Sequence, residues 1–123
     1  MARWLFKTEP SEYSFERLQK DRRATWDGIA NALALKHLRQ VMKGDEIAIY
    51  HTGSVKAVVG VAKAAADAKG DSVQIVPLRA IPPVTLASVK ADPKFKDFPL
   101  VRMGRLSVMP VPDALWKALT RVS

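Results

Sequence analysis

Residues 45–81 decide the fold, because three strand-like stretches follow one another there: "DEIAIYH" (45–51), "VKAVVGVAKAAA" (55–66) and "SVQIVPLRAI" (72–81). The first alternates with the period of a strand, and the other two are rich in β-branched residues. The cluster "DAKGD" (67–71) between them is typical of a turn and predicts an antiparallel hairpin. Gly60 and Pro77 within this hairpin indicate a bulge and an edge position, which are common where a sheet curls into a barrel.

Shorter elements precede these strands. The start of the chain alternates in a way that predicts a strand ending near Thr8. Ser14 is typical of a helix N-cap and predicts a short surface helix that runs into the charged segment "QKDRR" (19–23). Asn31 is a second predicted N-cap, for an amphipathic helix that ends at Gly44.

Further short elements follow the hairpin. Thr85 predicts one or two helical turns, and a strand is expected over residues 106–109 in a segment rich in helix breakers. The chain closes with a helix that starts at Pro112. The apolar face of that helix consists of Leu115, Leu119 and Val122. Residues 1–123 therefore predict one mixed α/β domain, a curled antiparallel sheet of the barrel type with short peripheral helices.

Composition limits the functions that the domain can have. The chain has 123 residues, of which 48% are hydrophobic, which suits one globular domain. Twenty Lys and Arg against twelve Asp and Glu give a net charge of +8, which favours nucleic acid as a partner but also serves solubility. No apolar run approaches the length of a membrane span or signal peptide, so we expect a cytoplasmic protein without membrane contact.

Signals for catalysis, metals and cofactors are absent from the sequence. There is no cysteine, and His37 and His51 lack the spacing of a metal site. A Ser107, His51 and Asp27 arrangement has no nucleophile motif to support it, and no glycine-rich phosphate loop occurs. We therefore expect no metal and no cofactor.

A different group of side chains suits a flat polar ring. Trp26 offers an aromatic face, Asn31 a donor and an acceptor, and Thr8 and Tyr50 offer hydroxyls, which is how proteins hold an extruded base. Each has a structural alternative: Trp26 is as well suited to a core as to a pocket wall, Asn31 to a cap, and His51 to a satisfied strand position. Trp4 and Trp116 are predicted to pack in the core.

Long motifs carry a resemblance to a known family. These motifs are "WLFKTEPSEYSFERL", "TWDGIANALALKHLR", "GDEIAIYHTG", "AVVGVAKA" and "LVRMGRLSVMPV". In this order and spacing the chain resembles the EVE domain family over almost its whole length. The resemblance implies a PUA-like fold, a curled β-barrel with peripheral helices, and a relationship to the YTH domains that read N6-methyladenine in RNA.

The resemblance also implies a function and a site. The expected function is non-catalytic reading of a modified nucleobase, modified cytosine or a similar base in DNA or RNA. The residues expected to hold the base are Lys7, Thr8, Glu9, Trp26, Asp27, Asn31, Tyr50, His51 and Ser107. Arg102 and Arg105 are expected at the rim, where they could reach a phosphate. With the family in view, a pocket wall becomes the favoured role of Trp26.

Two departures from the family pattern accompany the resemblance. The segment 29–33 keeps its asparagine but lacks the basic and aromatic neighbours that many EVE sequences carry, which bears on ligand preference. The turn at 67–71 is also shorter than usual.

Three hypotheses follow, and in each we expect a monomer. The first is a modified-base reader. The second is a small nucleic-acid hydrolase that uses Asp27 and His51. The third is an RNA-binding accessory module that binds through its charge without base selectivity.

Overall fold

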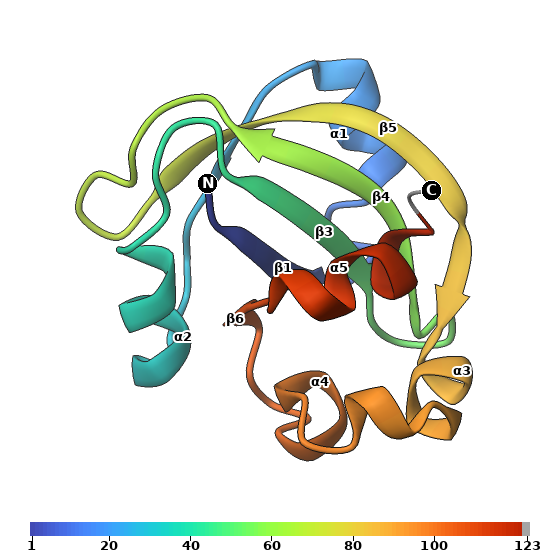
Figure 1. Ribbon diagram of the computed structural model, residues 1–123. Coiled ribbons are helices and arrows are strands. Elements are labelled where there is room, and N and C mark those ends of the chain that lie inside the picture. Colours follow the sequence, from blue (N-terminus) through green and yellow to red (C-terminus); the bar gives the residue numbers. More distant parts are fainter. Residues whose placement is uncertain (122–123) are drawn as a thin grey trace.

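A computed structural model describes residues 1–121, which form one curled six-stranded sheet with short helices around it (Figure 1). The strands follow the spatial order β2-β5-β4-β3-β1-β6. Their bounds are β1 (Arg3–Thr8), β2 (Ala24–Trp26), β3 (Glu46–His51), β4 (Ala57–Ala64), β5 (Val73–Thr85) and β6 (Val108–Pro110). The helices are α1 (Phe15–Asp21), α2 (Ala32–Leu38), α3 (Leu86–Ala91), α4 (Pro99–Arg102) and α5 (Asp113–Thr120), with a 3₁₀ turn, η1, at Pro93–Phe95.

The sheet is mixed, which corrects the expectation that it is antiparallel throughout. β1 and β3 pair in parallel, whereas the other neighbouring strands run antiparallel. The long connection through α1, β2 and α2 returns the chain to the starting end of the sheet, which is what a parallel pair requires. The parallel register pairs Lys7 with Tyr50 and Thr8 with His51, so both strands end at the same edge.

The predicted hairpin and its irregularities are confirmed. β4 and β5 pair antiparallel, with register shifts beside Gly60 and next to Pro77. A Cβ built on Gly60 would lie 2.5 Å from the Phe15 ring, so the absence of a side chain lets that ring pack on the strand backbone. Pro77 lies beyond the three β5 residues that pair with β2, and its missing N–H therefore removes no bond on that side.

Local capping rules predict the helix starts correctly. Ser14 accepts from Arg17 N at 3.0 Å, Asn31 Oδ1 accepts from Ala34 N at 2.9 Å, and Thr85 Oγ1 accepts from Ser88 N at 3.1 Å. These bonds satisfy amide groups that the first turn of each helix leaves free.

The end of α2 differs from the expectation. The helix ends at Leu38 instead of continuing to Gly44, because the amides of Gln40 and Val41 donate to His37 and Leu38 in tighter turns. Gly44 instead takes the left-handed φ of +90° in the turn that leads into β3.

Three short elements escaped the sequence analysis. β2 has three residues, too few to show a period. Pro93 and Pro99 stand at the starts of η1 and α4, so these prolines begin helical turns in the segment that was expected to be a loop with one strand. That strand, β6, starts at Val108, two residues later than predicted.

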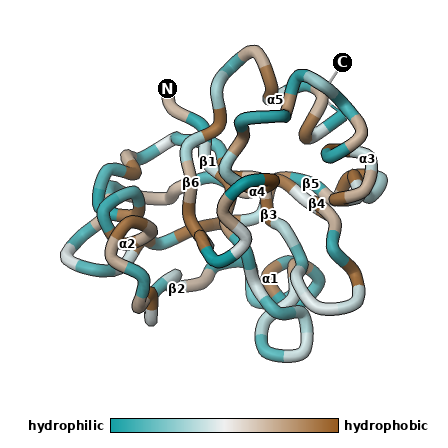
Figure 2. Tube along the Cα trace, turned by 90° about the horizontal axis from the view of Figure 1, so that it is seen from below, coloured by the Kyte–Doolittle hydropathy of each residue, from teal (hydrophilic) through white to brown (hydrophobic). Residues whose placement is uncertain are grey.

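One continuous hydrophobic core fills the curl of the sheet. Trp4 and Trp116 are buried in it, as predicted, and Leu119 of α5 lies there too. Figures 1 and 2 place α1 and α5 on opposite sides of the sheet, and Figure 2 shows hydrophobic and hydrophilic residues alternating along α2. The predicted position of Val122 lies outside the described residues. Over residues 1–121, no helix combines the length and apolar character of a membrane span.

Candidate functional site

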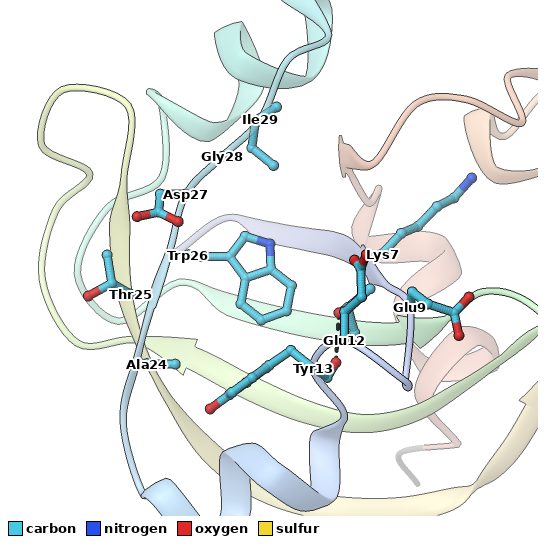
Figure 3. Close-up of a pocket in the computed structure, with 11 residues that line it drawn as sticks. Lys7, Glu9, Glu12, Tyr13, Ala24, Thr25, Trp26, Asp27, Gly28 and Ile29 are labelled. Carbon is cyan, nitrogen blue, oxygen red and sulfur yellow. Dashed lines mark hydrogen bonds between the residues drawn. The ribbon is translucent and has the colours of Figure 1, made fainter.

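A cavity of about 400 Å³ opens where β1 ends beside β2 (Figure 3). Its volume falls in the range of about 300–1,000 Å³ that is usual for ligand pockets. Three segments line it: the end of β1, the turn that leads to α1, and β2 with the loop after it. The lining residues are Lys7, Thr8, Glu9, Glu12, Tyr13, Ala24, Thr25, Trp26, Asp27, Gly28 and Ile29. Five of the predicted site residues are among them.

Backbone and hydroxyl hydrogen bonds hold the turn after β1 against the pocket. The carbonyl of Glu9 accepts from the amides of Glu12 and Tyr13, both at 2.9 Å. Thr8 Oγ1 donates to the Tyr13 carbonyl at 2.7 Å. The predicted hydroxyl of Thr8 therefore shapes the pocket by fixing its wall.

Trp26 belongs both to the core and to the pocket. Its side chain is only 8% exposed, and its ring lies 5.6 Å from that of Phe6 at an interplanar angle of 35°. The Tyr13 ring meets it nearly at a right angle, at 80° and 6.1 Å between centroids. The two readings of Trp26 that the sequence left open are thus compatible, because one strip of a core indole faces the cavity.

Tyr13 is a pocket wall that the sequence analysis missed. Its hydroxyl donates to Asp21 Oδ2 at 3.0 Å, and the Arg17 guanidinium lies 6.0 Å from its ring centroid. Burial, followed by the bond to Asp21, raises the pKa of Tyr13 to about 12, so the phenol stays neutral. Nothing in the local sequence distinguishes Tyr13 from a surface residue before the Ser14 cap, and its role depends on the distant Trp26.

The carboxylates of the lining differ in the number of hydrogen bonds that they accept. Glu9 Oε2 accepts from Thr52 Oγ1 at 3.2 Å, and its Oε1 accepts from the amide and hydroxyl of Ser11 at 3.3 and 3.2 Å. Glu9 thus fixes its own turn. Within residues 1–121, no hydrogen bond or ion pair involves the carboxylates of Glu12 or Asp27, and both residues are exposed.

Lys7 is the cation of the lining. Its Nζ donates to the Gly104 carbonyl at 2.9 Å and lies 5.8 Å from the Tyr50 ring centroid. Burial lowers the pKa of Lys7, because water around the ammonium is partly lost. Lys7 thereby ties the end of β1 to the loop before β6.

Four predicted base-binding residues lie outside the lining. Asn31 caps α2, and Tyr50 is 4% exposed beneath Lys7. His51 Nε2 accepts from the Phe15 amide at 3.0 Å, and burial lowers its pKa, against the opposing effect of Glu9. Ser107 contributes its carbonyl to the Lys7 amide at 2.9 Å.

The predicted phosphate-binding arginines are exposed near the same loop. Arg102 Nη2 lies 3.5 Å from Asp97 Oδ1, with 66% of its side chain exposed. Arg105 is exposed one residue after Gly104, the partner of Lys7, and it makes no ion pair within residues 1–121. Of the two, Arg105 is the more available to a ligand.

The Asp27–His51 pair expected for a hydrolase does not come together at the cavity. Asp27 lines the cavity but His51 does not, and the His51 acceptor nitrogen is already occupied by the Phe15 amide. The described residues hold no group of three or more His, Asp or Glu side chains placed to bind a metal ion.

Sequence and structure comparisons place the chain among known proteins. Residues 2–122 match the family described as EVE domain. Rpa0253 from Rhodopseudomonas palustris is 33% identical, with a TM-score of 0.92 over 98% of this chain and 92% of that one. Atu2648 from Agrobacterium tumefaciens is 32% identical, with a TM-score of 0.90 over 98% and 92% of the two chains.

A more distant neighbour was solved with a ligand. Human THYN1, in complex with DNA that contains 5-methylcytosine, is 21% identical, with a TM-score of 0.90 over 98% of this chain and 96% of that one. The search of curated proteins found no match. These likenesses confirm the mixed α/β, PUA-like fold that the sequence predicts.

Proposed function

Because this chain belongs to the EVE domain family, we propose that it binds nucleic acid and takes a modified nucleobase into the pocket beside Trp26 and Tyr13. The aromatic corner carries this proposal, since the two rings meet at 80° on the wall of a cavity of about 400 Å³. A flat base or its methyl group can lie against one ring while its edge meets the other. The role is recognition without chemistry on the base.

The distribution of charge supports a base, not a phosphate, inside the pocket. The lining carries three carboxylates and one ammonium, although the whole chain has a net charge of +8. Carboxylates repel a phosphate but accept the N–H groups of a neutral base. The positive residues outside the pocket then meet the phosphates, which makes affinity depend on salt.

The fold shared with human THYN1 supports modified cytosine as the class of base. THYN1 was solved with DNA that contains 5-methylcytosine. DNA carrying 5-methylcytosine is therefore the first ligand to test for this chain.

Tryptophan fluorescence tests the proposal. Short oligonucleotides carrying cytosine, 5-methylcytosine, 5-hydroxymethylcytosine, adenine or N6-methyladenine are titrated into the protein. Contact with a base should quench Trp26, which lines the pocket, while Trp4 and Trp116 lie outside the lining and should not respond. We expect a stronger response to one modified base than to its parent. The Trp26→Phe variant, which keeps an aromatic ring against Phe6, should lose the response.

Other outcomes would contradict the proposal. An equal response to modified and unmodified strands that falls steeply with salt would favour an accessory module that binds RNA without selectivity. Turnover of an oligonucleotide that is lost in Asp27→Asn would favour a hydrolase.

A further inference from the structure

A carboxylate without a partner stands next to the aromatic wall of the pocket. Asp27 directly follows Trp26 at the end of β2 and lines the cavity. Its carboxylate makes no hydrogen bond or ion pair within residues 1–121. Gly28 then takes the left-handed φ of +71°, which turns the chain immediately after Asp27.

The chemistry of Asp27 restricts what it can bind. An ionised carboxylate only accepts hydrogen bonds, so its partner in a ligand must donate one. The cation of the lining is already engaged, because Lys7 Nζ donates to the Gly104 carbonyl and makes no ion pair with Asp27. At the position of cytosine N4, cytosine and adenine present an amino group, whereas thymine and guanine present a carbonyl oxygen.

We propose that the Asp27 carboxylate accepts a hydrogen bond from the exocyclic amino group of the bound base. The pocket then selects bases that carry an amino group over bases that carry a carbonyl there. This inference rests on the proposed function and makes Asp27 a residue that determines specificity within it. Thymine should be rejected because its O4 would face the carboxylate without a proton between them.

Lys7 is directed away from the aromatic wall. In Figure 3 its side chain extends away from the Trp26 ring, and its Nζ donates to the Gly104 carbonyl at 2.9 Å. Recognition of the exocyclic group is therefore assigned to Asp27 and not to Lys7.

One pair of bases compares the two exocyclic groups directly. 5-Methylcytosine and thymine carry the same methyl group and differ along the pairing edge: an amino group beside a bare N3 in 5-methylcytosine, and a carbonyl beside an N3–H in thymine. Each is placed opposite an abasic site in the same duplex, so that neither has a pairing partner to lose on extrusion. The Kd of each labelled duplex is measured by fluorescence anisotropy. The expected Kd for thymine is about ten times that for 5-methylcytosine, or more.

A conservative variant and a matched control assign the effect to one residue. Asp27→Asn replaces the carboxylate by an amide that can donate to thymine, so the ratio of the two Kd values should fall to near one. Glu16→Gln, on α1 and outside the pocket lining, removes the same charge and should leave the ratio unchanged. Both side chains are exposed and neither makes a hydrogen bond or ion pair within residues 1–121, so both variants should fold.

The outcomes separate this inference from the proposed function. Equal affinity for the 5-methylcytosine and thymine duplexes, with weaker binding of cytosine, would overturn the role of Asp27 and leave a modified-base reader. A ratio that falls equally in Glu16→Gln would assign selectivity to the overall charge and also overturn it. Loss of any preference for modified bases would remove the proposed function and the inference together.

Discussion

Two tryptophan–aspartate pairs in this domain have opposite surroundings: Trp4 and Asp45 are hydrogen-bonded in the core, whereas Trp26 and Asp27 are neighbours in sequence at the pocket. Trp4 Nε1 donates to Asp45 Oδ2 at 3.0 Å inside the core. The same carboxylate accepts from the amides of Ala2 and Met42 at 3.0 and 2.9 Å. Asp45 is 4% exposed, so its three donors replace the water that burial removes.

In the second pair, Trp26 and Asp27, the carboxylate lacks the donors that Asp45 has. Trp26 packs on Phe6 with a strip of its ring facing the pocket, and Asp27 is exposed with a carboxylate that has no partner within residues 1–121. A satisfied pair holds the fold together, whereas a pair with free acceptors is suited to a ligand. The difference lies in the neighbouring donors and not in the residue types.

The largest expected effect is the difference in stability between variants that truncate the two aspartates. Asp45→Ala leaves the buried Trp4 Nε1–H and two amides without their acceptor, and we expect the free energy of unfolding to fall by about 3 kcal/mol. Asp27→Ala should change it by less than about 0.5 kcal/mol, because Asp27 is exposed and its carboxylate makes no hydrogen bond or ion pair within residues 1–121. Urea unfolding followed by circular dichroism measures both. Similar losses in the two variants would refute the contrast.

The contact between α1 and β4 is structural in the same sense as the Trp4 pair. Phe15 packs on Gly60, where an added Cβ would lie 2.5 Å from the ring. Gly60→Ala should therefore lower the free energy of unfolding by about 2 kcal/mol through overpacking. Phe15→Leu shortens the opposing side chain, so the double variant should lose less than the sum of the single variants. If the losses of the two single variants simply add in the double variant, the contact between Phe15 and residue 60 is not the cause of the destabilisation.

The same contrast explains how far the sequence could be read. Caps such as Ser14 and Thr85 depend on a bond three residues away, and local rules therefore predict them. The parallel pairing of β1 with β3 depends on the path of the whole segment between them. Periodicity does not report that path.

The candidate site shows the same limit. Motifs placed Trp26 and Asp27 together, and both line the pocket. Tyr13 was missed because it lies in the turn before α1, whereas its partner Trp26 lies on β2. His51 was assigned to the base although its nitrogen accepts from the distant Phe15 amide, a bond that no spacing in the sequence reveals. The motifs therefore locate the site better than they identify which residues line it.

Acid should weaken the contribution of His51 to the stability of the fold. Burial lowers the pKa of His51, whose neutral ring accepts from the Phe15 amide. The unfolded chain then binds the proton more readily. The contribution of His51 is therefore complete above its ordinary pKa of about 6.5 and is lost as pH falls through the lowered folded value.

Unfolding by urea from about pH 7.5 down to about pH 5 measures this loss. His51→Gln, which does not titrate, should have a smaller pH dependence than the wild type. The pKa of His37 is also lowered, by burial and then by the charge of Lys36. His37→Gln should therefore remove the pH dependence that is due to His37 and leave the pH dependence that is due to His51. An unchanged slope in His51→Gln would show that this hydrogen bond does not depend on protonation.

The smallest expected effect concerns the rim, where charge assists binding without adding to stability. Arg105 is exposed beside the loop that Lys7 holds, whereas Arg102 lies 3.5 Å from Asp97. If Arg105 meets a phosphate, Arg105→Gln should reduce the slope of log affinity against log salt by about 0.9 for duplex DNA. Arg102→Gln should reduce it less, because Asp97 already offsets part of that charge. Lys117→Gln, on α5 and outside the pocket lining, is the control for net charge alone. Equal slopes in all three variants would mean that the protein attracts DNA through its overall charge, and the pocket alone would then remain as the specific part of the molecule.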